Sequence, residues 1–497
     1  MTKTFSFAAL LILVSSTACH SHPSKETDPK TLFVGLSAPP TNLDPRLATD
    51  ANSQRIDDLI FTSLVRNGPQ LQPVPQGALS WKIENRQVTF FLRKDLKFSD
   101  GQPVTAQDVV FSFSEYQKPG SPFASSLKTV QKVSAPDPYR VVLSLSENDG
   151  SLMTNLDNIK ILSKNSLQKW GDHFGDHPEG SGPFEFTGAD NNQLTLTKSP
   201  WQSYVSPRAE KVIFKFVRDE NTRYLKMIKG DLDVLLNELQ EEKITEIKKS
   251  STLNVIVTPG VNFNFILLNL RDDRLKESKL RRALYSAIHF DEIIKFKLDG
   301  LATQASSIIA PPSPYCNPDL HFPRITEDEA KKTIKDLGLQ GASISLETSD
   351  QAVTNGQILA QEMEGLGITV PLKSFEWGTF YNDLKSGHFQ MATARWVGIV
   401  DPDIYRESLD SHEFVPGRNR GYYLNHAFDN LVEGAQKEIN LDKRKKSYFK
   451  AEQIIADDLP IIPLWYNANV SVLSRRVKNF IPMITGSFFP LVEAFKE

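Results

Sequence analysis

The sequence predicts an α/β protein of two or three domains, and two observations support this fold class. At 497 residues the chain is too long to fold around one hydrophobic core. In its C-terminal half, residues 343–348, 357–363, 368–372 and 390–396 have the patterns of a strand, a helix, a strand and a strand. Such alternation predicts a largely parallel sheet with helices packed on it.

The composition describes a globular protein without a strong charge of either sign. Apolar residues make up 40% of the chain and charged residues 24%, and the formal net charge is -3. A nucleic-acid-binding protein would carry a clear basic excess, so this class is excluded. Beyond the first 18 residues, no apolar run is long enough to span a bilayer.

Residues 1–18 predict an export signal. A positive charge precedes an apolar core, residues 5–14, that is too short for a membrane span, and small residues precede Cys19. The pattern resembles a bacterial lipoprotein signal, which would place a lipid on Cys19, although Ser16 stands where such signals usually carry Leu. The alternative is an ordinary secretory signal cleaved nearby. In both cases the protein leaves the cytoplasm, and the polar residues 19–30 form a tether.

Residues 87–116 predict a strand, a turn and a helix in succession. Residues 87–92 have the period of a strand with one buried face, and residues 80–84 are placed to pair with them in a hairpin. Thr105 and Asp108 stand three residues apart, so that a hydroxyl and a carboxylate can satisfy the free amides at the start of a helix.

The same stretch carries the main resemblance to a known family. Residues 90–113, FFLRKDLKFSDGQPVTAQDVVFSF, resemble the signature of the solute-binding proteins of ABC importers, the family of the oligopeptide-, dipeptide- and nickel-binding receptors. Three later segments are similar to further motifs of this family, so the resemblance covers essentially the whole mature chain. They are residues 177–183 (HPEGSGP), 280–288 (LRRALYSAI) and 452–464 (EQIIADDLPIIPL).

The resemblance implies a two-lobed periplasmic-binding-protein fold of the cluster C type, with three domains and a ligand cleft between the lobes. Domain I is then assembled from three separate pieces of the chain, with domains II and III inserted between them. The expected ranges are 31–66, 181–262 and 469–497 for domain I, 67–180 for domain II and 263–468 for domain III.

Local patterns predict the other elements in order. Helix 220–229 is expected to end at Gly230, which can adopt the left-handed closing conformation. An apolar strand at 262–270 leads into a helix at 280–288, and Thr326 with Glu329 forms a capping box for the next helix. Strands are expected at 32–36, 139–145, 194–197, 211–217 and 233–236, and another strand after residue 465 returns to the first lobe.

The most informative candidate site is the loop after strand 390–396. A strand that ends in Trp396 and opens into a loop with Asp401 and Asp403 is where open α/β sheets place ligand groups. The resemblance also implies how a peptide would be held. In the peptide-binding members of this family, an aspartate soon after the tryptophan pairs with the α-ammonium group of the peptide, but Ile399 occupies that position here. Asp401 is expected either to replace this anchor or to be a plain loop residue. Asp403 is expected to contact the ligand or, as we favour, to cap the next helix.

Arg395 and Asn42 complete the candidate ligand-binding residues. The planar guanidinium of Arg395 suits a carboxylate, although strand alternation would point it away from the cleft if Trp396 faces inward. Asn42 precedes a Leu-Asp-Pro turn, and the resemblance places that turn near the cleft. A plain proline-rich turn is the alternative.

Other reactive or charged residues are assigned no role in binding. Cys316 lies in a proline-rich segment without a nearby histidine, so a structural, unreactive thiol is expected. Residues 443–446, KRKK, are expected to form a solvated helix face. The sequence contains no HExxH, GxSxG, GxxxxGK[ST] or GxGxxG motif. It therefore predicts no catalytic residue, no metal site and no cofactor.

Together these observations predict the substrate-binding lipoprotein of an ABC importer. It would capture oligopeptides or dipeptides by lobe closure and deliver them to a membrane permease with its ATPase subunits. Because Ile399 replaces the amine anchor, a metal chelate, an opine or a sugar is an alternative ligand. A cell-wall or peptide hydrolase using Asp401 and Asp403 is the alternative from another class. The protein is expected to be a monomer of the periplasm or cell envelope, anchored only through Cys19, and a signalling role is left open.

Overall fold

The computed structural model describes residues 28–497 except 202, 203 and 416. The predicted signal peptide, Cys19 and most of the tether lie outside the described residues. Among the residues that the structure describes, no helix is both long and apolar enough to cross a membrane.

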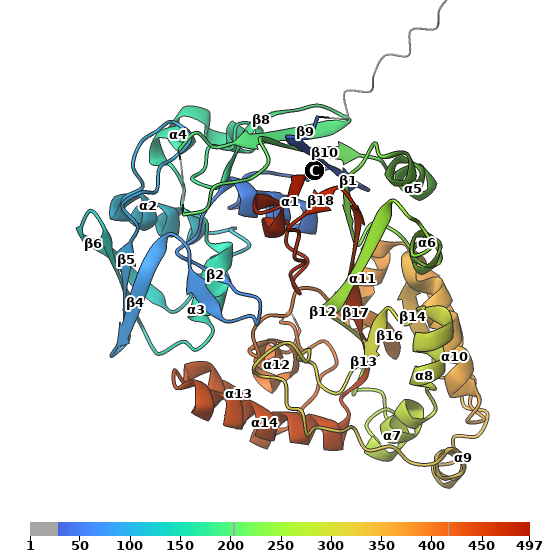
Figure 1. Cartoon of the computed structure of the whole chain (residues 1–497). Coiled ribbons are helices and arrows are strands. Elements are labelled where there is room, and N and C mark those ends of the chain that lie inside the picture. The colour runs from blue at the N-terminus through green and yellow to red at the C-terminus, as the bar shows by residue number, and fades with distance from the viewer. Residues whose placement is uncertain (1–27, 202–203, 416) are drawn as a thin grey trace, which may run out of the picture.

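Two lobes are joined by one continuous sheet of 11 strands (Figure 1). Its order is β15-β14-β16-β12-β17-β11-β1-β10-β9-β8, with β13 paired to β17. The strands are β1 (Thr31–Leu36), β8 (Phe184–Ala189), β9 (Gln193–Lys198), β10 (Lys211–Phe216), β11 (Val234–Leu236), β12 (Leu253–Leu268), β13 (Ala302–Gln304), β14 (Leu346–Ser349), β15 (Leu372–Phe375), β16 (Met391–Trp396) and β17 (Ile461–Ser474).

The predicted α/β class is confirmed, but the prediction of a largely parallel sheet is wrong. Parallel pairing is confined to β15-β14-β16 at one end of the sheet and β11-β1-β10 towards the other. The remaining pairs, including β16-β12-β17-β11, are antiparallel. The alternation of neighbouring elements could not reveal this, because the paired residues of β12 and β17 are about 200 positions apart in the sequence.

The strands β12 and β17 connect the lobes. They pair antiparallel along most of their length, with a break in register between Thr258 and Asn262. Within this break a Cβ atom on Gly260 would overlap the carbonyl oxygen of Asn467. We name the parts on either side of the break the first lobe (residues 28–258 and 469–497) and the second lobe (residues 262–467). The finer division into three domains remains a prediction.

The first lobe contains a separate four-stranded antiparallel sheet, in the order β4-β5-β7-β6. The predicted hairpin is confirmed as β4 and β5. The capped helix is also confirmed: the backbone amide of Thr105 donates to the Asp108 carboxylate at 2.8 Å, and its hydroxyl donates to the same oxygen at 2.7 Å. These elements and the small strands of this lobe are β2 (Val65–Asn67), β3 (Pro73–Pro75), β4 (Ala78–Glu84), β5 (Gln87–Leu92), α2 (Ala106–Tyr116), β6 (Val130–Asp137), β7 (Arg140–Leu145), β18 (Val477–Lys478) and β19 (Phe495–Lys496).

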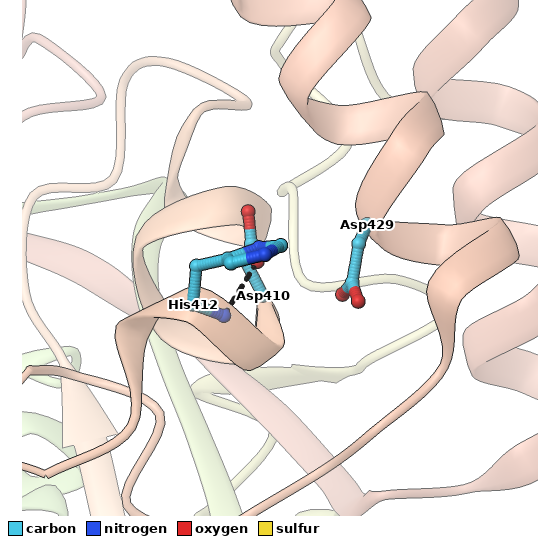
Figure 2. A group of neighbouring side chains, drawn as sticks. All are labelled: Asp410, His412 and Asp429. Carbon is cyan, nitrogen blue, oxygen red and sulfur yellow. Dashed lines mark hydrogen bonds and ion pairs between the residues drawn. The ribbon is translucent and has the colours of Figure 1, made fainter.

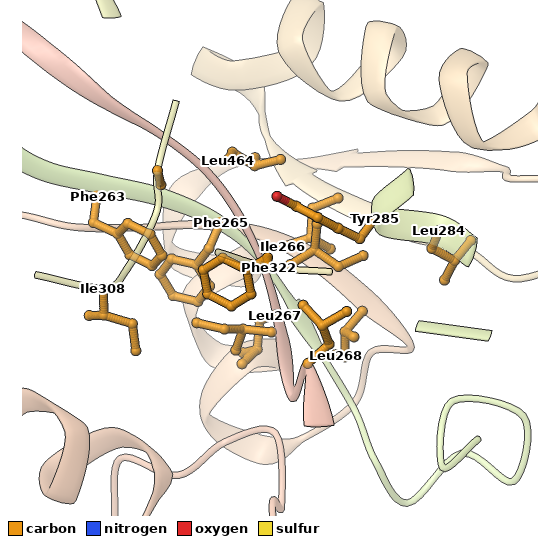
Figure 3. Close-up of a cluster of buried hydrophobic side chains, with 14 of the residues drawn as sticks. Phe263, Phe265, Ile266, Leu267, Leu268, Leu284, Tyr285, Ile308, Phe322 and Leu464 are labelled. Atoms are coloured by element: carbon orange, nitrogen blue, oxygen red, sulfur yellow. The ribbon is translucent and has the colours of Figure 1, made fainter. Parts of the chain in front are cut away.

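Helices cover both lobes, and most of the second lobe shares one core. Figure 3 shows part of this core, to which Phe263 and Phe265 of β12 and Leu464 of β17 belong. The helices are α1 (Ala51–Ile60), α3 (Leu152–Asn155), α4 (Lys164–Trp170), α5 (Glu220–Lys229), α6 (Glu241–Ile247), α7 (Ser278–Ser286), α8 (Phe290–Glu292), α9 (Glu327–Asp336), α10 (Val353–Glu364), α11 (Trp377–Ser386), α12 (Ile404–Leu409), α13 (His426–Lys437) and α14 (Leu441–Asp458).

Predictions based on residues that typically start or end a helix agree with the structure. Gly230 closes α5 with a φ of 82°, and Thr326 with Glu329 forms the capping box of α9. The strand predicted at 368–372 is wrong in position, because β15 begins only at Leu372.

Candidate functional site

A cavity of about 1250 Å³ lies between the two lobes. The first lobe contributes α1, β2 and the segments around residues 151–160 and 483–489 to its wall. The second lobe contributes α11, the end of β16 and the loop that follows it. The volume exceeds the usual range for drug-sized ligands, which leaves room for a small peptide and water.

Trp396 forms an aromatic part of the cavity wall at the end of β16. Its ring centroid lies 4.3 Å from that of Phe265 and 5.7 Å from that of Phe263, both on the adjacent strand β12. These rings belong to the packed core and hold the indole in place, and the Trp396 side chain remains partly exposed. The indole therefore offers a fixed apolar surface to a ligand.

Arg395 also lines the cavity, although it precedes Trp396 on the strand. Its Nε donates to Oδ1 of Asn264 at 3.2 Å, and the Asn264 amide is in turn held by Oδ1 of Asn467 at 2.6 Å. Arg395 forms no ion pair with any residue that the structure describes, and desolvation by the surrounding protein lowers its pKa. Its guanidinium thus retains free donors for an acceptor from outside the chain.

Asp401 lines the cavity as well, but its carboxylate is occupied by Arg444 of α14. The two side chains form a two-pronged ion pair, with Nη2–Oδ1 at 2.6 Å and Nη1–Oδ2 at 3.1 Å. Asp401 is 9% exposed and Arg444 is 1% exposed. The expectation that residues 443–446 form a solvated face is therefore wrong for Arg444, which lies on the same buried side of α14 as Tyr448 and Ala451.

Asp403 occupies the N-cap position of α12, as favoured, but its side chain does not bond to the helix amides. Its oxygens instead accept from Nε and Nη2 of Arg406, at 3.0 and 2.9 Å. Asp403 also lines the cavity, so both acids of the predicted loop lie at its wall with a cationic partner already in place.

Ile399 and Asn42 lie in different places. Ile399 is buried in the second-lobe core and presents an apolar surface at the cavity wall. Asn42 lines a smaller pocket of about 700 Å³, together with His177 and Asp172, rather than the cavity between the lobes. Its Oδ1 accepts from the backbone amide of Asp44 at 2.8 Å, so it stabilises its own turn.

The cavity wall includes charged residues that the sequence analysis did not single out. Lys160 is nearly buried and pairs with Asp58 at 2.7 Å and with Asp157 at 3.7 Å. Three arginines, Arg55, Arg66 and Arg420, also line the cavity. They come from α1, β2 and the loop before α13, and no sequence motif links elements so far apart.

One group of potential metal ligands lies away from the cavity. Asp410, His412 and Asp429 bring their ligating atoms within 4.8 Å of one another (Figure 2). Asp410 accepts from the backbone amide of His412 at 2.9 Å, and Asp429 accepts from the Ser411 hydroxyl at 2.7 Å. These bonds explain the cluster as a support for the turn after α12.

At Cys316, burial raises the pKa of the thiol to about 11, as suits an unreactive cysteine.

Comparison with known proteins matches residues 72–413 to bacterial extracellular solute-binding proteins, family 5. The probable D,D-dipeptide-binding periplasmic protein DdpA of Escherichia coli is 25% identical over 97% of this chain and 96% of its own. Heme-binding protein A of Haemophilus influenzae is 23% identical over 92% and 91%. The structure of the ABC transporter substrate-binding protein CtaP of Listeria monocytogenes superposes with a TM-score of 0.86 at 23% identity, covering 94% of this chain and 99% of that one.

The two-lobed periplasmic-binding-protein fold is confirmed by this superposition. Members of the family act outside the cytoplasm, deliver ligands to an ABC permease and are not enzymes, so the hydrolase alternative is set aside. The chain belongs to family 5 of the bacterial extracellular solute-binding proteins, the substrate-binding proteins of ABC importers.

Proposed function

We propose that this chain captures small peptides or peptide-like molecules for an ABC importer by closing its lobes around them. The observation that carries the proposal is the cavity between the lobes, which both lobes line. A ligand that contacts both walls binds the closed form more tightly than the open form and therefore shifts the equilibrium towards closure. The dipeptide-binding relative supports a peptide ligand.

The cavity wall favours a ligand that does not depend on a free α-amine. Ile399 offers no charge, and Asp401 is already neutralised by Arg444. We therefore propose that Asp401 fixes the loop and that Trp396 and Arg395 contact the ligand. A blocked peptide, a metal chelate, an opine or a sugar is the second candidate, and a relative named as heme-binding supports a wider range of ligands.

We also propose that the mature protein is a monomer anchored by a lipid on Cys19. The small residues before this cysteine support the lipid anchor. Mass spectrometry of the native protein from its host is expected to show an added lipid mass that is absent from Cys19→Ser, and a native protein without that mass would contradict the anchor.

Native mass spectrometry of the soluble chain from Ser21 onward, purified gently from its host, tests the function. Added masses of short peptides would support a peptide receptor. A single sharp mass or a metal isotope pattern would indicate the second candidate. A chain that carries no small molecule and binds none in titration would contradict the proposed function.

Trp396→Ala is expected to weaken binding of the copurified ligand by about 1 kcal/mol or more, because the indole is an aromatic anchor held by Phe263 and Phe265. Isothermal titration calorimetry measures the change. Trp81→Ala is the matched control, because Trp81 packs on Phe90 away from the cavity. Equal losses in both variants would remove Trp396 from the site.

A further inference from the structure

All but one of the acidic side chains at the cavity wall have a cationic partner within the protein, and Asp58 and Asp157 share theirs. Asp58 and Asp157 pair with Lys160, and Glu407 pairs with Arg418. Asp401 and Asp403 pair with Arg444 and Arg406, which lie behind the wall. The remaining acid, Asp57, is fully buried, and desolvation raises its pKa well above the usual value.

Four arginines at the same wall have no such partner. Arg55, Arg66, Arg395 and Arg420 form no ion pair with any described residue. Asp58 and Glu238 act on the charge of Arg55 from a distance, but these acids pair with Lys160 and Arg223. The cavity therefore has an excess of positive charge, in a chain whose formal net charge is -3.

Aromatic rings hold three of these guanidinium groups by their faces. Arg55 lies 5.7 Å from the ring centroid of Phe488, Arg66 lies 4.5 Å from that of Phe489, and Arg420 lies 5.0 Å from that of Tyr381. Contact with a ring face fixes the plane of an arginine and leaves its N–H donors free in that plane. One donor is used at Arg420, whose Nη2 donates to the Tyr381 hydroxyl at 3.2 Å.

The surroundings of three of these arginines favour an anionic partner. Nε of Arg420 is buried without a hydrogen-bond acceptor among the described residues, a situation that costs free energy until an acceptor arrives. Arg55, like Arg395, is desolvated enough to lower its pKa. An anion in the cavity would relieve both costs, because arginine pairs with carboxylates through charge-assisted hydrogen bonds.

We propose that the ligand of this chain is an acid with at least two anionic groups, bound by arginines from both lobes. Arg55 and Arg66 belong to the first lobe, and Arg395 and Arg420 belong to the second. An acid that spans the cavity pairs with both sets only when the lobes are closed, so its charge drives closure. This inference rests on the proposed function and narrows its ligand class to short acidic peptides or non-peptide polycarboxylates.

The test compares synthetic probes by isothermal titration calorimetry with the soluble chain from Ser21 onward. The peptides are Glu-Ala-Glu, its N-acetylated form, Ala-Ala-Ala and Lys-Ala-Lys, and citrate represents the non-peptide acids. At least one acidic probe is expected to bind about tenfold or more tightly than the neutral and basic peptides, and its affinity should fall as salt is added. Preference for the acidic peptides identifies a peptide source, and preference for citrate identifies a non-peptide source.

Substitutions then test whether the named arginines cause the preference for acidic probes. Arg395→Gln and Arg66→Gln are each expected to weaken the preferred acidic probe about tenfold or more, and by a larger factor than they weaken Ala-Ala-Ala, which carries only one carboxylate. Arg395→Lys, which keeps the charge, should restore part of the loss. Arg218→Gln is the matched control, because Arg218 is exposed and outside the cavity wall. Circular dichroism checks that each variant is folded.

Three results would contradict the inference. Lys-Ala-Lys or Ala-Ala-Ala binding as tightly as every acidic probe would overturn it while leaving the receptor function intact. Equal effects of Arg395→Gln and Arg218→Gln would remove the cavity arginines from recognition. A chain that binds no probe and carries no small molecule would refute the proposed function and this inference with it.

Discussion

At the residue scale, the pair of Asp401 and Arg444 links the cavity wall to the core. Both side chains are nearly buried, and Arg444 also donates to the Tyr315 hydroxyl at 3.0 Å. Removing one partner leaves the other charge without its counter-charge in a largely buried place. The pair therefore fixes the loop between β16 and α12 that carries the candidate site.

Arg444→Met is expected to lower the free energy of unfolding by about 3–5 kcal/mol, because it leaves the Asp401 carboxylate buried and unpaired. Urea denaturation followed by circular dichroism measures the loss. Adding Asp401→Asn to the variant should recover part of it. Lys446→Met, at an exposed position of the same helix, is the control, and an equal loss there would contradict a special role of the buried pair.

A second buried carboxyl group, Glu452 of α14, has no cation beside it. Oε1 accepts from the Ser307 hydroxyl at 2.6 Å and from the Tyr405 hydroxyl at 2.8 Å, and Oε2 has no partner among the described residues. Burial raises its pKa from 4.5 to about 7. The folded protein thus holds a proton that the unfolded chain releases at lower pH.

Glu452 is expected to make the protein less stable as pH rises from 4.5 to about 7, because the folded state binds more protons in this range. The loss of folding free energy that this group causes reaches at most about 3 kcal/mol, and it stays constant at pH values above the pKa of the folded state. Glu452→Gln should remove it, so that the variant gains stability relative to the native protein between pH 5 and pH 8. Urea midpoints across this range measure the gain, and parallel curves for both proteins would contradict the raised pKa.

Residue patterns could predict which loop forms the cavity wall but not how its acids are partnered. Trp396, Asp401 and Asp403 follow a strand, so their place at a strand end can be derived from the sequence. Arg444 stands 43 residues further on in a run of cations that reads as a surface. Its burial depends on the packing of α14, which no local pattern encodes.

At the element scale, the paired strands β12 and β17 connect the lobes through a point where the register breaks. Gly260 lies at this point and passes against the backbone of Asn467, with no room for a side chain. The ribbon can bend here, because the ladder is locally interrupted. A change at Gly260 therefore acts on stability and on the geometry between the lobes together.

Gly260→Ala is expected to destabilise the protein by about 1–3 kcal/mol, because the new Cβ atom displaces a backbone carbonyl rather than a flexible side chain. Thermal and urea unfolding measure the loss. Gly434→Ala in α13, where a Cβ atom meets open space, is the matched control and should raise stability by up to about 1 kcal/mol. Unchanged stability of Gly260→Ala would show that the crossing tolerates a side chain.

Helices whose first turn carries a recognisable capping pair could be predicted from the sequence. The capping pairs at Thr105 and Thr326 mark helices that the structure contains. The first half of β12 was missed, because Pro259 and Gly260 interrupt its pattern in the way that a loop does. Here pairing with β17 outweighs local preference.

At the scale of the whole molecule, the two-lobed fold could be predicted because family motifs are spread along the entire chain. The course of the sheet could not, since one ladder through both lobes depends on contacts between distant segments. The opposite signs of the net charge and of the unpaired charge in the cavity likewise appear only when the chain is folded.

The shared strand β17 also constrains the order of folding. It is the partner of β11 in the first lobe and of β12 in both lobes, and it follows every other strand of the 11-stranded sheet in the sequence. The part of this sheet that joins the lobes can therefore form only after β17 has been made, and contacts between distant segments form slowly. The four-stranded sheet β4-β5-β7-β6 needs none of these contacts, so the join between the lobes is expected to be completed after it.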